Sequence, residues 1–383
     1  MIIKNDFNPE CITFSQMQMT FDIRTLYRRL AVLTRTYMRN RYYNIDQPDA
    51  LFDRLYLEYL DLGTMLHLNF GRENQDRYSQ MLGQFVIALR ELISAQIEGN
   101  TEGVNQNLQR LYENLDTRGA FLEAMNPYWS ADEYRSLFET YSQYLIEDAN
   151  AISSGNFNED IAIFDNILEL TQILGNTFAQ GVYNYVTSGQ TTSPAQIGER
   201  CITYDQMQII QNITTVWFDL EVWMRSYMLN KYFGLSADAE ATFNRLIRVV
   251  VDYTNEIEYI YGEEFSANLL QLLYEYLDLF VNYINAYQAG NVDEVNRIIP
   301  LLYQNAASRA ALQGSANAFL SADEWRKRLY DMQVRGLINE AAALFSGNAA
   351  SNLDIFIDLL TQAESMADYF ERALFNYYTQ PNM

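Results

Sequence analysis

Apolar side chains recur every three or four positions along most of the chain, which is the spacing of one face of an α-helix. Leu26, Leu30, Leu33 and Tyr37 follow this period in the first half, and the run from Leu269 to Phe280 follows it in the second. No segment sustains the strict alternation of a half-buried strand. The pattern therefore predicts an all-α fold. The expected helices lie near 14–43, 49–68, 75–98, 102–125, 131–153 and 158–185, with equivalents about 191 residues further on.

Short motifs mark the expected helix ends. Gly-Asn pairs, which suit a left-handed C-cap, begin at Gly99, Gly155, Gly290 and Gly347. Ser130 with Glu133, and Ser321 with Glu324, have the spacing of a capping box, in which the Glu side chain reaches back to the Ser backbone amide. Pro300 interrupts a helical pattern, so we expect a kink or a helix start there.

The second half of the chain repeats the first. Cys11-Ile12-Thr13 recurs as Cys201-Ile202-Thr203, at an offset of 190 residues, and the offset drifts by only two residues over the whole unit. Short connections between long helices favour antiparallel bundles. We therefore predict two tandem homologous antiparallel bundles of five to six helices each. The predicted units span 1–186 and 199–383, and the segment 187–198, rich in Gly, Pro, Ser and Thr, is the linker.

The two cysteines, Cys11 and Cys201, occupy matching places in the repeat. Two cysteines do not make a disulfide framework, so we predict partly buried free thiols rather than a bridge. The N-terminal residues from Met1 to Asp6 lack the apolar core of a secretory signal. No apolar run approaches the roughly 20 residues that span a bilayer. The expected location is the cytoplasm, with a spore or export without a signal peptide as the alternative.

The charge balance excludes several partners. Acidic residues number 49 against 26 basic ones, which gives a net charge of -23. Nucleic acids and anionic membranes both require clustered Lys and Arg, so neither is an expected partner. Only three lysines occur, and the polar surface must rely on Asn, Gln, Tyr and Arg. Tyr and Arg are enriched at protein interfaces, although a lineage bias in composition would give the same balance.

The usual catalytic and metal-binding motifs are missing. His67 is the only histidine, and Glu258 stands at its place in the second unit. There is no zinc-binding spacing, no glycine-rich phosphate loop and no nucleophile elbow, so no cofactor, metal or enzymatic activity is expected. One cluster of acids could converge inside the first bundle, but the second unit does not preserve it, and we predict solvated helix faces. These acids are Glu139, Glu147, Asp148, Asp165 and Glu169.

Two features recur in both units and are candidate binding or structural sites. Arg118 and Arg309 lie in the middle of matching helices, where a buried ion pair or capped network is the expected role and a small anionic ligand is the alternative. Asn126-Pro127-Tyr128-Trp129 ends one helix and leads into the next. Its counterpart, from Asn317 to Leu320, keeps the turn but loses Pro and Trp, which suits packing rather than catalysis.

The string from Tyr112 through Asn126-Pro127-Tyr128-Trp129, after Gly99-Asn100, resembles a family of small helical proteins from Clostridium-like spore-formers. Members often carry an automatic label of acetylglutamate kinase. The resemblance implies a helical bundle of about one unit's length, so this chain would be a tandem pair. It also implies histidines within the bundle, where this chain has Gln84 and Gln143, which argues against a family metal or acid–base site here.

The leading hypothesis is a non-enzymatic structural or protein-interaction protein, which binds a partner or assembles with itself. A small-molecule or metal-binding ferritin-like bundle is the second hypothesis. An enzyme that uses carboxylates alone, and a helical membrane-active toxin, remain further alternatives.

Overall fold

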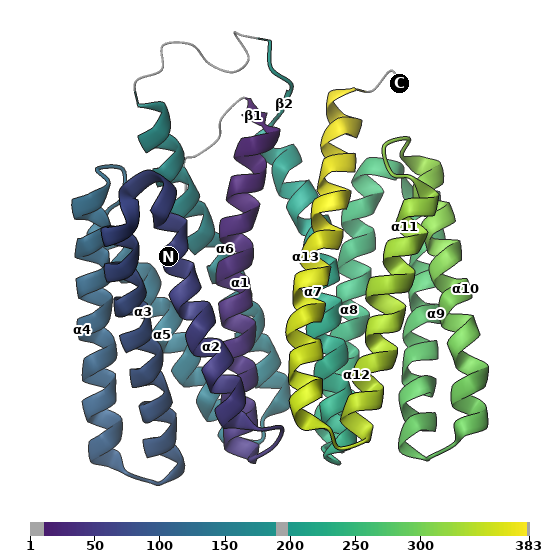
Figure 1. The fold of residues 1–383 in the computed structure, drawn as a ribbon, viewed down its shortest axis with the longest axis horizontal. Helices are drawn as coiled ribbons and strands as arrows, with labels where there is room; N and C mark the ends of the chain where they lie inside the picture. The colour runs from purple at the N-terminus through teal and green to yellow at the C-terminus, as the bar shows by residue number, and fades with distance from the viewer. Residues whose placement is uncertain (1–10, 189–197, 381–383) are drawn as a thin grey trace. The chain divides into compact units, whose positions relative to one another are not determined.

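The computed structural model describes residues 11–188 and 198–380, and nearly all of them lie in helices (Figure 1). The predicted all-α class is therefore confirmed. The first helices are α1 (Phe14–Tyr43), α2 (Pro48–Leu62), the short 3-10 helix η1 (Gly63–Leu66), α3 (His67–Ile97), α4 (Thr101–Met125), α5 (Ala131–Ser154) and α6 (Phe157–Thr187). The later ones are α7 (Tyr204–Tyr232), α8 (Ser236–Tyr261), α9 (Glu263–Gln288), α10 (Val292–Ala316), α11 (Ala322–Arg328), η3 (Leu329–Val334), α12 (Arg335–Phe345) and α13 (Ala349–Thr379).

Contacts between residues divide the chain into two compact units. The first begins at Ser15 and the second at Pro194, and the short segment before Ser15 belongs by its contacts to the second unit. Within each unit the helices stand side by side along a common direction (Figure 1). The N-terminal residues before Cys11 and most of the predicted linker lie outside the described residues.

The junction of the second and third helices differs from the prediction. The helix expected to reach residue 68 ends at Leu62, and α3 already begins at His67. The backbone then breaks at Gly71, where φ is 81°, and Gly262 with φ 86° separates α8 from α9 at the matching place. Both units thus turn at a glycine because few other residues adopt this conformation without strain.

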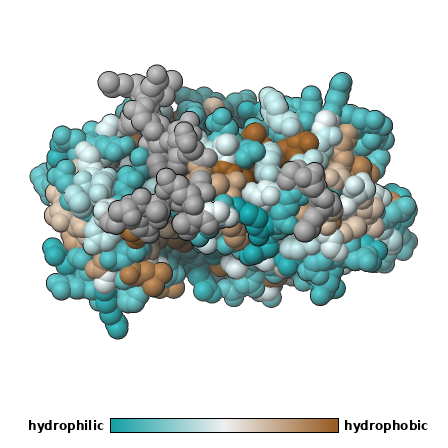
Figure 2. Space-filling model, turned by 90° about the horizontal axis from the view of Figure 1, so that it is seen from above, coloured by the Kyte–Doolittle hydropathy of each residue, from teal (hydrophilic) through white to brown (hydrophobic). Residues whose placement is uncertain are grey.

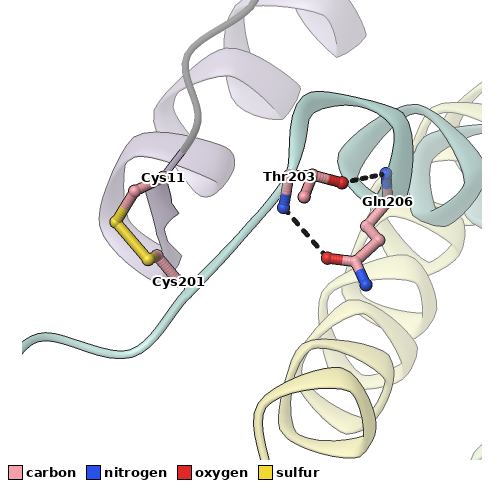
Figure 3. Close-up of a disulfide and its surroundings, with 4 residues drawn as sticks. All are labelled: Cys11, Cys201, Thr203 and Gln206. Carbon is pink, nitrogen blue, oxygen red and sulfur yellow. Dashed lines mark hydrogen bonds between the residues drawn. A yellow bond between two sulfur atoms is a disulfide. The ribbon is translucent and has the colours of Figure 1, made fainter. Parts of the chain in front are cut away.

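The predictions for the helix ends are confirmed in part. Gly99, Gly155, Gly290 and Gly347 all have positive φ, as the C-cap prediction requires. Ser130 and Ser321 accept the N-cap hydrogen bonds, but neither Glu is seen to return the second bond of a capping box. The complete box is instead formed by Thr203 and Gln206 (Figure 3). Of the two alternatives predicted at Pro300, a kink or a helix start, the helix start is wrong, because Pro300 lies inside α10, which begins at Val292.

A π-helix carries the one-residue insertion in the second repeat. Ser321 matches Ser130 at an offset of 191 residues, whereas Ser346 matches Ser154 at 192. Between these points lies η3, in which the backbone adopts the wider π-helical turn. A single inserted residue is commonly accommodated in this way, because the extra residue bulges while the helix continues.

The prediction of free thiols is wrong, because Cys11 and Cys201 form a disulfide (Figure 3). The strands β1 (Ile12–Thr13) and β2 (Cys201–Ile202) pair in antiparallel register, with Thr13 opposite Cys201. This pairing holds the two Cα atoms 5.1 Å apart, within the range that a disulfide bridges. Phe14, directly after β1, packs against Phe375 of α13 with ring centroids 5.2 Å apart. The matching cysteines therefore meet through strands that no periodicity predicted.

Most of the surface visible in Figure 2 is hydrophilic, with separate apolar patches. Among the described helices, none has an apolar stretch long enough to cross a membrane. The most exposed large apolar side chains include Leu68 (92%) and Tyr259 (78%), which stand at matching positions of the two repeats.

Candidate functional site

Arg118 lies in the middle of α4 and is buried, with 4% of its surface exposed. Its guanidinium carbon lies 4.2 Å from the ring centroid of Phe138 and 4.7 Å from that of Phe85. These are cation–π distances, and they place the charge between two aromatic faces. No ion pair or hydrogen bond links Arg118 to a carboxylate in the described residues.

Four tyrosines surround Arg118. Burial raises the pKa of Tyr27, Tyr59, Tyr78 and Tyr141 above the ordinary value, and the charge of Arg118 opposes the rise in each. All four phenols therefore stay neutral near pH 7. The hydroxyls of Tyr27 and Tyr78 interact with each other, and Arg118 interacts with the Tyr78 hydroxyl, although none of these contacts has the length of an ordinary hydrogen bond. Neutral hydroxyl groups therefore surround Arg118, and no carboxylate balances its charge.

The second unit holds its matching arginine differently. Arg309 is buried, its Nε donates to Asn305 Oδ1 at 2.9 Å, and one Nη donates to Gln333 Oε1 at 2.8 Å. The guanidinium carbon also lies 4.5 Å from the ring centroid of Tyr276. Burial lowers the pKa of Arg309 to about 10. Side-chain amides, rather than an ion pair, therefore make up the network around Arg309.

A buried ionic cluster in the first unit escaped the sequence analysis. Arg35 of α1 donates to both oxygens of Asp160 at 2.8 and 2.7 Å, and Arg39 lies 3.8 Å from the same carboxylate. Asp148, one of the acids predicted to lie on a solvated face, is fully buried beside them, so that prediction is wrong for Asp148. Glu139 and Glu169 are exposed as predicted.

The pKa values of the two buried aspartates, Asp148 and Asp160, are shifted in opposite directions. Burial alone would raise the pKa of Asp160, but Arg35 and Arg39 outweigh it and hold the pKa below the ordinary value. Burial, reinforced by the charge of Asp160, raises the pKa of Asp148 well above it. The protonated form of Asp148 is therefore favoured, and so is the ionised form of Asp160. Both are sealed from solvent, so the pair holds α1, α5 and α6 together and is closed to a substrate.

In the second unit the carboxylate that pairs with the buried arginine stands at another position. Arg225, the repeat of Arg35, pairs with Glu340 at 2.6 Å. Glu340 stands at the place of Asp148, and Asn352 stands at the place of Asp160. Asn352 donates its amide to the backbone oxygen of Glu340 at 3.2 Å. One buried arginine is thus kept in both units while its ionised partner comes from a different helix, α12 instead of α6.

Glu221 is a buried acid of α7, and replacing it by glutamine is expected to stabilise the second unit at pH 8 by ~1–2 kcal/mol. Burial, reinforced by the charge of Glu340, raises the pKa of Glu221 well above its ordinary value. The folded state thus binds this proton more tightly than the unfolded chain. The contribution of protonated Glu221 to folding stability is therefore fully present below the ordinary pKa of Glu. It declines as the pH rises toward the raised pKa of Glu221 in the folded state.

Urea unfolding of Glu221→Gln and wild type between pH 4 and 8 checks this expectation. The exposed Glu258→Gln is the matched control and should keep the wild-type pH dependence. Equal pH slopes for Glu221→Gln and wild type would contradict it.

The tetrapeptide from Asn126 to Trp129 is a packed turn. Asn126 Oδ1 accepts a hydrogen bond from the backbone N–H of Tyr128 at 3.0 Å, and Asn317 makes the same bond in the second unit. Trp129 is buried and donates its indole N–H to the Phe178 carbonyl at 3.3 Å. Its ring lies tilted against the Phe178 ring, with centroids 4.6 Å apart. A Cβ at Gly181 would collide with the indole, so the glycine makes room for it. These contacts attach the turn to α6.

An open groove of about 670 Å³ lies on the first unit. Helices α3 and α4 supply most of its lining, and α6 contributes Tyr185, whose ring centroid lies 4.8 Å from that of Phe70. Its lining residues are Asn69, Phe70, Asn74, Arg77, Met81, Thr117, Ala120, Phe121, Ala124, Met125 and Tyr185. In the second unit Phe265 stands at the place of Asn74, and its ring lies 5.0 Å from that of Tyr261.

Within residues 11–188 and 198–380, no three His, Cys, Asp or Glu side chains come together in a cluster that could hold a metal ion. Comparison of the chain with protein-family models, with curated proteins and with solved structures gives no match. The resemblance to the family from spore-formers stays a prediction.

Proposed function

We propose that this chain is a non-enzymatic protein-interaction protein whose first unit binds a segment of another protein in the groove between α3 and α4. The groove carries the proposal, since about 670 Å³ is enough to receive several side chains. Methionine and aromatic rings, here Met81, Met125 and Phe121, suit a surface that adapts to a partner.

The chemistry of the groove favours an apolar segment that carries a carboxylate. Arg77 is exposed at the groove, and its guanidinium carbon lies 5.0 Å from the ring centroid of Phe121. An arginine stacked on a ring keeps its donors available for a bidentate carboxylate. A second copy of this chain is the less favoured occupant, because each copy carries a net charge of -23 and two copies repel.

Filling the groove tests the proposal. Asn74→Phe introduces the side chain that Phe265 supplies in the second unit, and it is expected to weaken partner binding at least about tenfold. Gln80→Phe adds the same ring at an exposed position of α3 outside the groove lining and is the matched control. A photo-crosslinking amino acid at position 121 captures the partner, and affinity is then measured with the purified pair.

The outcomes are distinct. Loss of crosslinking and affinity in Asn74→Phe but not in Gln80→Phe supports the proposal. Crosslinks to a second copy alone, with a dimer in light scattering, would replace a foreign partner by self-assembly. Equal capture by both variants, or a strict monomer that captures nothing, would overturn a role for the groove.

A further inference from the structure

A second cavity of the first unit, distinct from the groove, lies against Arg118. Its volume is about 20 Å³, which is room for a particle of the size of one water molecule. Every lining residue is buried. They are Tyr27, Leu30, Tyr59, Leu62, Leu82, Phe85, Arg118, Phe138, Tyr141, Thr171 and Leu174.

Two polar atoms of this lining make no hydrogen bond of ordinary length to a protein atom. They are Arg118 Nε and the hydroxyl oxygen of Tyr27, and Arg118 and Tyr27 both interact with the hydroxyl of Tyr78. The lining contains no Asp or Glu, so no carboxylate balances the guanidinium. An arginine cannot shed its proton in a protein, and a buried charge without a counter-charge is strongly unfavourable. The cavity therefore combines a cation that no carboxylate compensates with a neighbouring phenol hydroxyl.

The neighbouring hydroxyl groups carry no negative charge. The phenols remain neutral because burial raises their pKa, so none of them compensates Arg118 electrostatically. The Tyr59 hydroxyl already shares a hydrogen bond with that of Thr34 at 3.3 Å. Thr171 already donates its hydroxyl to the Leu168 carbonyl at 2.7 Å. A cation would be repelled by Arg118, and a neutral molecule would leave the charge unbalanced.

We propose that the first unit binds a monatomic anion of chloride size in this cavity, held by Arg118 and the hydroxyl of Tyr27. The volume excludes phosphate, sulfate and carboxylic acids unless the helices separate. The anion compensates the charge that the fold encloses, so it acts as a structural ligand of the bundle core.

The second unit provides an internal comparison. Two nitrogens of Arg309, Nε and Nη2, donate to the oxygens of Asn305 and Gln333, and only its Nη1 lacks a partner. In the first unit the matching oxygen, Asn114 Oδ1, has no partner and makes no bond to Arg118. The amide dipoles around Arg309 take the place that the anion takes beside Arg118. The site is thus specific to the first unit.

Two measurements on the full chain test the site. Crystals grown in sodium bromide are expected to show an anomalous peak beside Arg118 within hydrogen-bond distance of Tyr27, and none beside Arg309. In solution, the melting temperature should rise with chloride when gluconate keeps the ionic strength constant, because a ligand that binds only the folded state stabilises it.

Substitutions test whether chloride acts at the cavity beside Arg118. Arg118→Met is expected to abolish the chloride dependence, whereas Arg309→Met, the matched control, should retain it. Tyr27→Phe should weaken chloride binding about tenfold or more, since a hydrogen bond to a charged group is lost. Tyr112→Phe removes an exposed hydroxyl and should change nothing.

Some results would overturn the proposal. The measurements on the wild-type protein remain decisive even if a variant does not fold. An ordered water without bromide signal, or a melting temperature that ignores chloride, would show that the cavity holds a neutral molecule. A chloride effect that survives in Arg118→Met, or a bromide peak only elsewhere, would place the anion at another site.

Discussion

The double variant Asp148→Asn/Asp160→Asn is expected to destabilise the first unit by about 3–5 kcal/mol, because it removes the carboxylate that buried Arg35 binds and the acid beside it. Arg35 is 3% exposed and donates two hydrogen bonds to Asp160 in the wild type. Its guanidinium carbon also lies 4.8 Å from the centroid of the Phe164 ring, which cannot replace a carboxylate.

Each single variant is expected to cost much less than the double. In Asp160→Asn the charge that raises the pKa of Asp148 disappears, so Asp148 can ionise and pair with the arginines. That arrangement is the one the second unit uses, where Glu340 pairs with Arg225 and Asn352 replaces the other acid. In Asp148→Asn the main ion pair stays in place. The two positions should therefore show a coupling energy of about 2 kcal/mol or more in a double-mutant cycle.

Hydrogen exchange followed by mass spectrometry resolves the effect by unit, since peptides of α1 and α6 should lose protection while those of α7 and α13 keep theirs. The single variants Asp148→Asn and Asp160→Asn complete the cycle and serve as controls. Additive costs, with no coupling, would show that the second acid does not substitute for the first.

The helices could be predicted because their signals are local. Leu30, Leu33 and Tyr37 repeat at helical spacing, and all three are buried in α1. Glycines such as Gly155 end helices because few other residues accept positive φ. The break at Gly71 was missed because the apolar period continues on both sides of it.

The buried polar contacts could not be predicted because they join distant segments. Arg35 and Asp160 lie 125 positions apart in the chain, and no short motif connects them. One signal was available, since Arg35 recurs as Arg225 in the repeat just as Arg118 recurs as Arg309. The partner was concealed because the acid that binds Arg35, Asp160, is replaced by Asn352 in the second unit, where Glu340 at the place of Asp148 binds the arginine instead.

The disulfide was missed for a related reason. Cys11 and Cys201 stand at matching places of a repeat, and matching places of separate units need not meet. They meet because the segment before Ser15 adds its strand β1 to β2. Two-residue strands leave no alternation in the sequence from which the pairing could be inferred.

Removing the disulfide is expected to destabilise the first unit by up to about 5 kcal/mol. The bridge joins residues separated by 190 positions, and the closed loop contains every helix from α1 to α6. Closing so long a loop restricts the unfolded chain of the first unit, whereas the chain of the second lies mostly outside it. The loss should therefore fall mainly on α1–α6.

Urea unfolding and hydrogen exchange of Cys11→Ser/Cys201→Ser check this asymmetry, with reductant added to both proteins as the control. Reductant should lower the unfolding midpoint of wild type to that of the variant and leave the variant unchanged. Thiol trapping in intact cells then separates the two expected locations, because disulfides persist in oxidising compartments and are rare in the cytosol. Trapped free thiols in cells would favour the cytoplasm, and a protected bridge would favour export. Two titratable thiols in oxidised purified protein, or equal loss of protection in both units, would contradict the role assigned to the bridge.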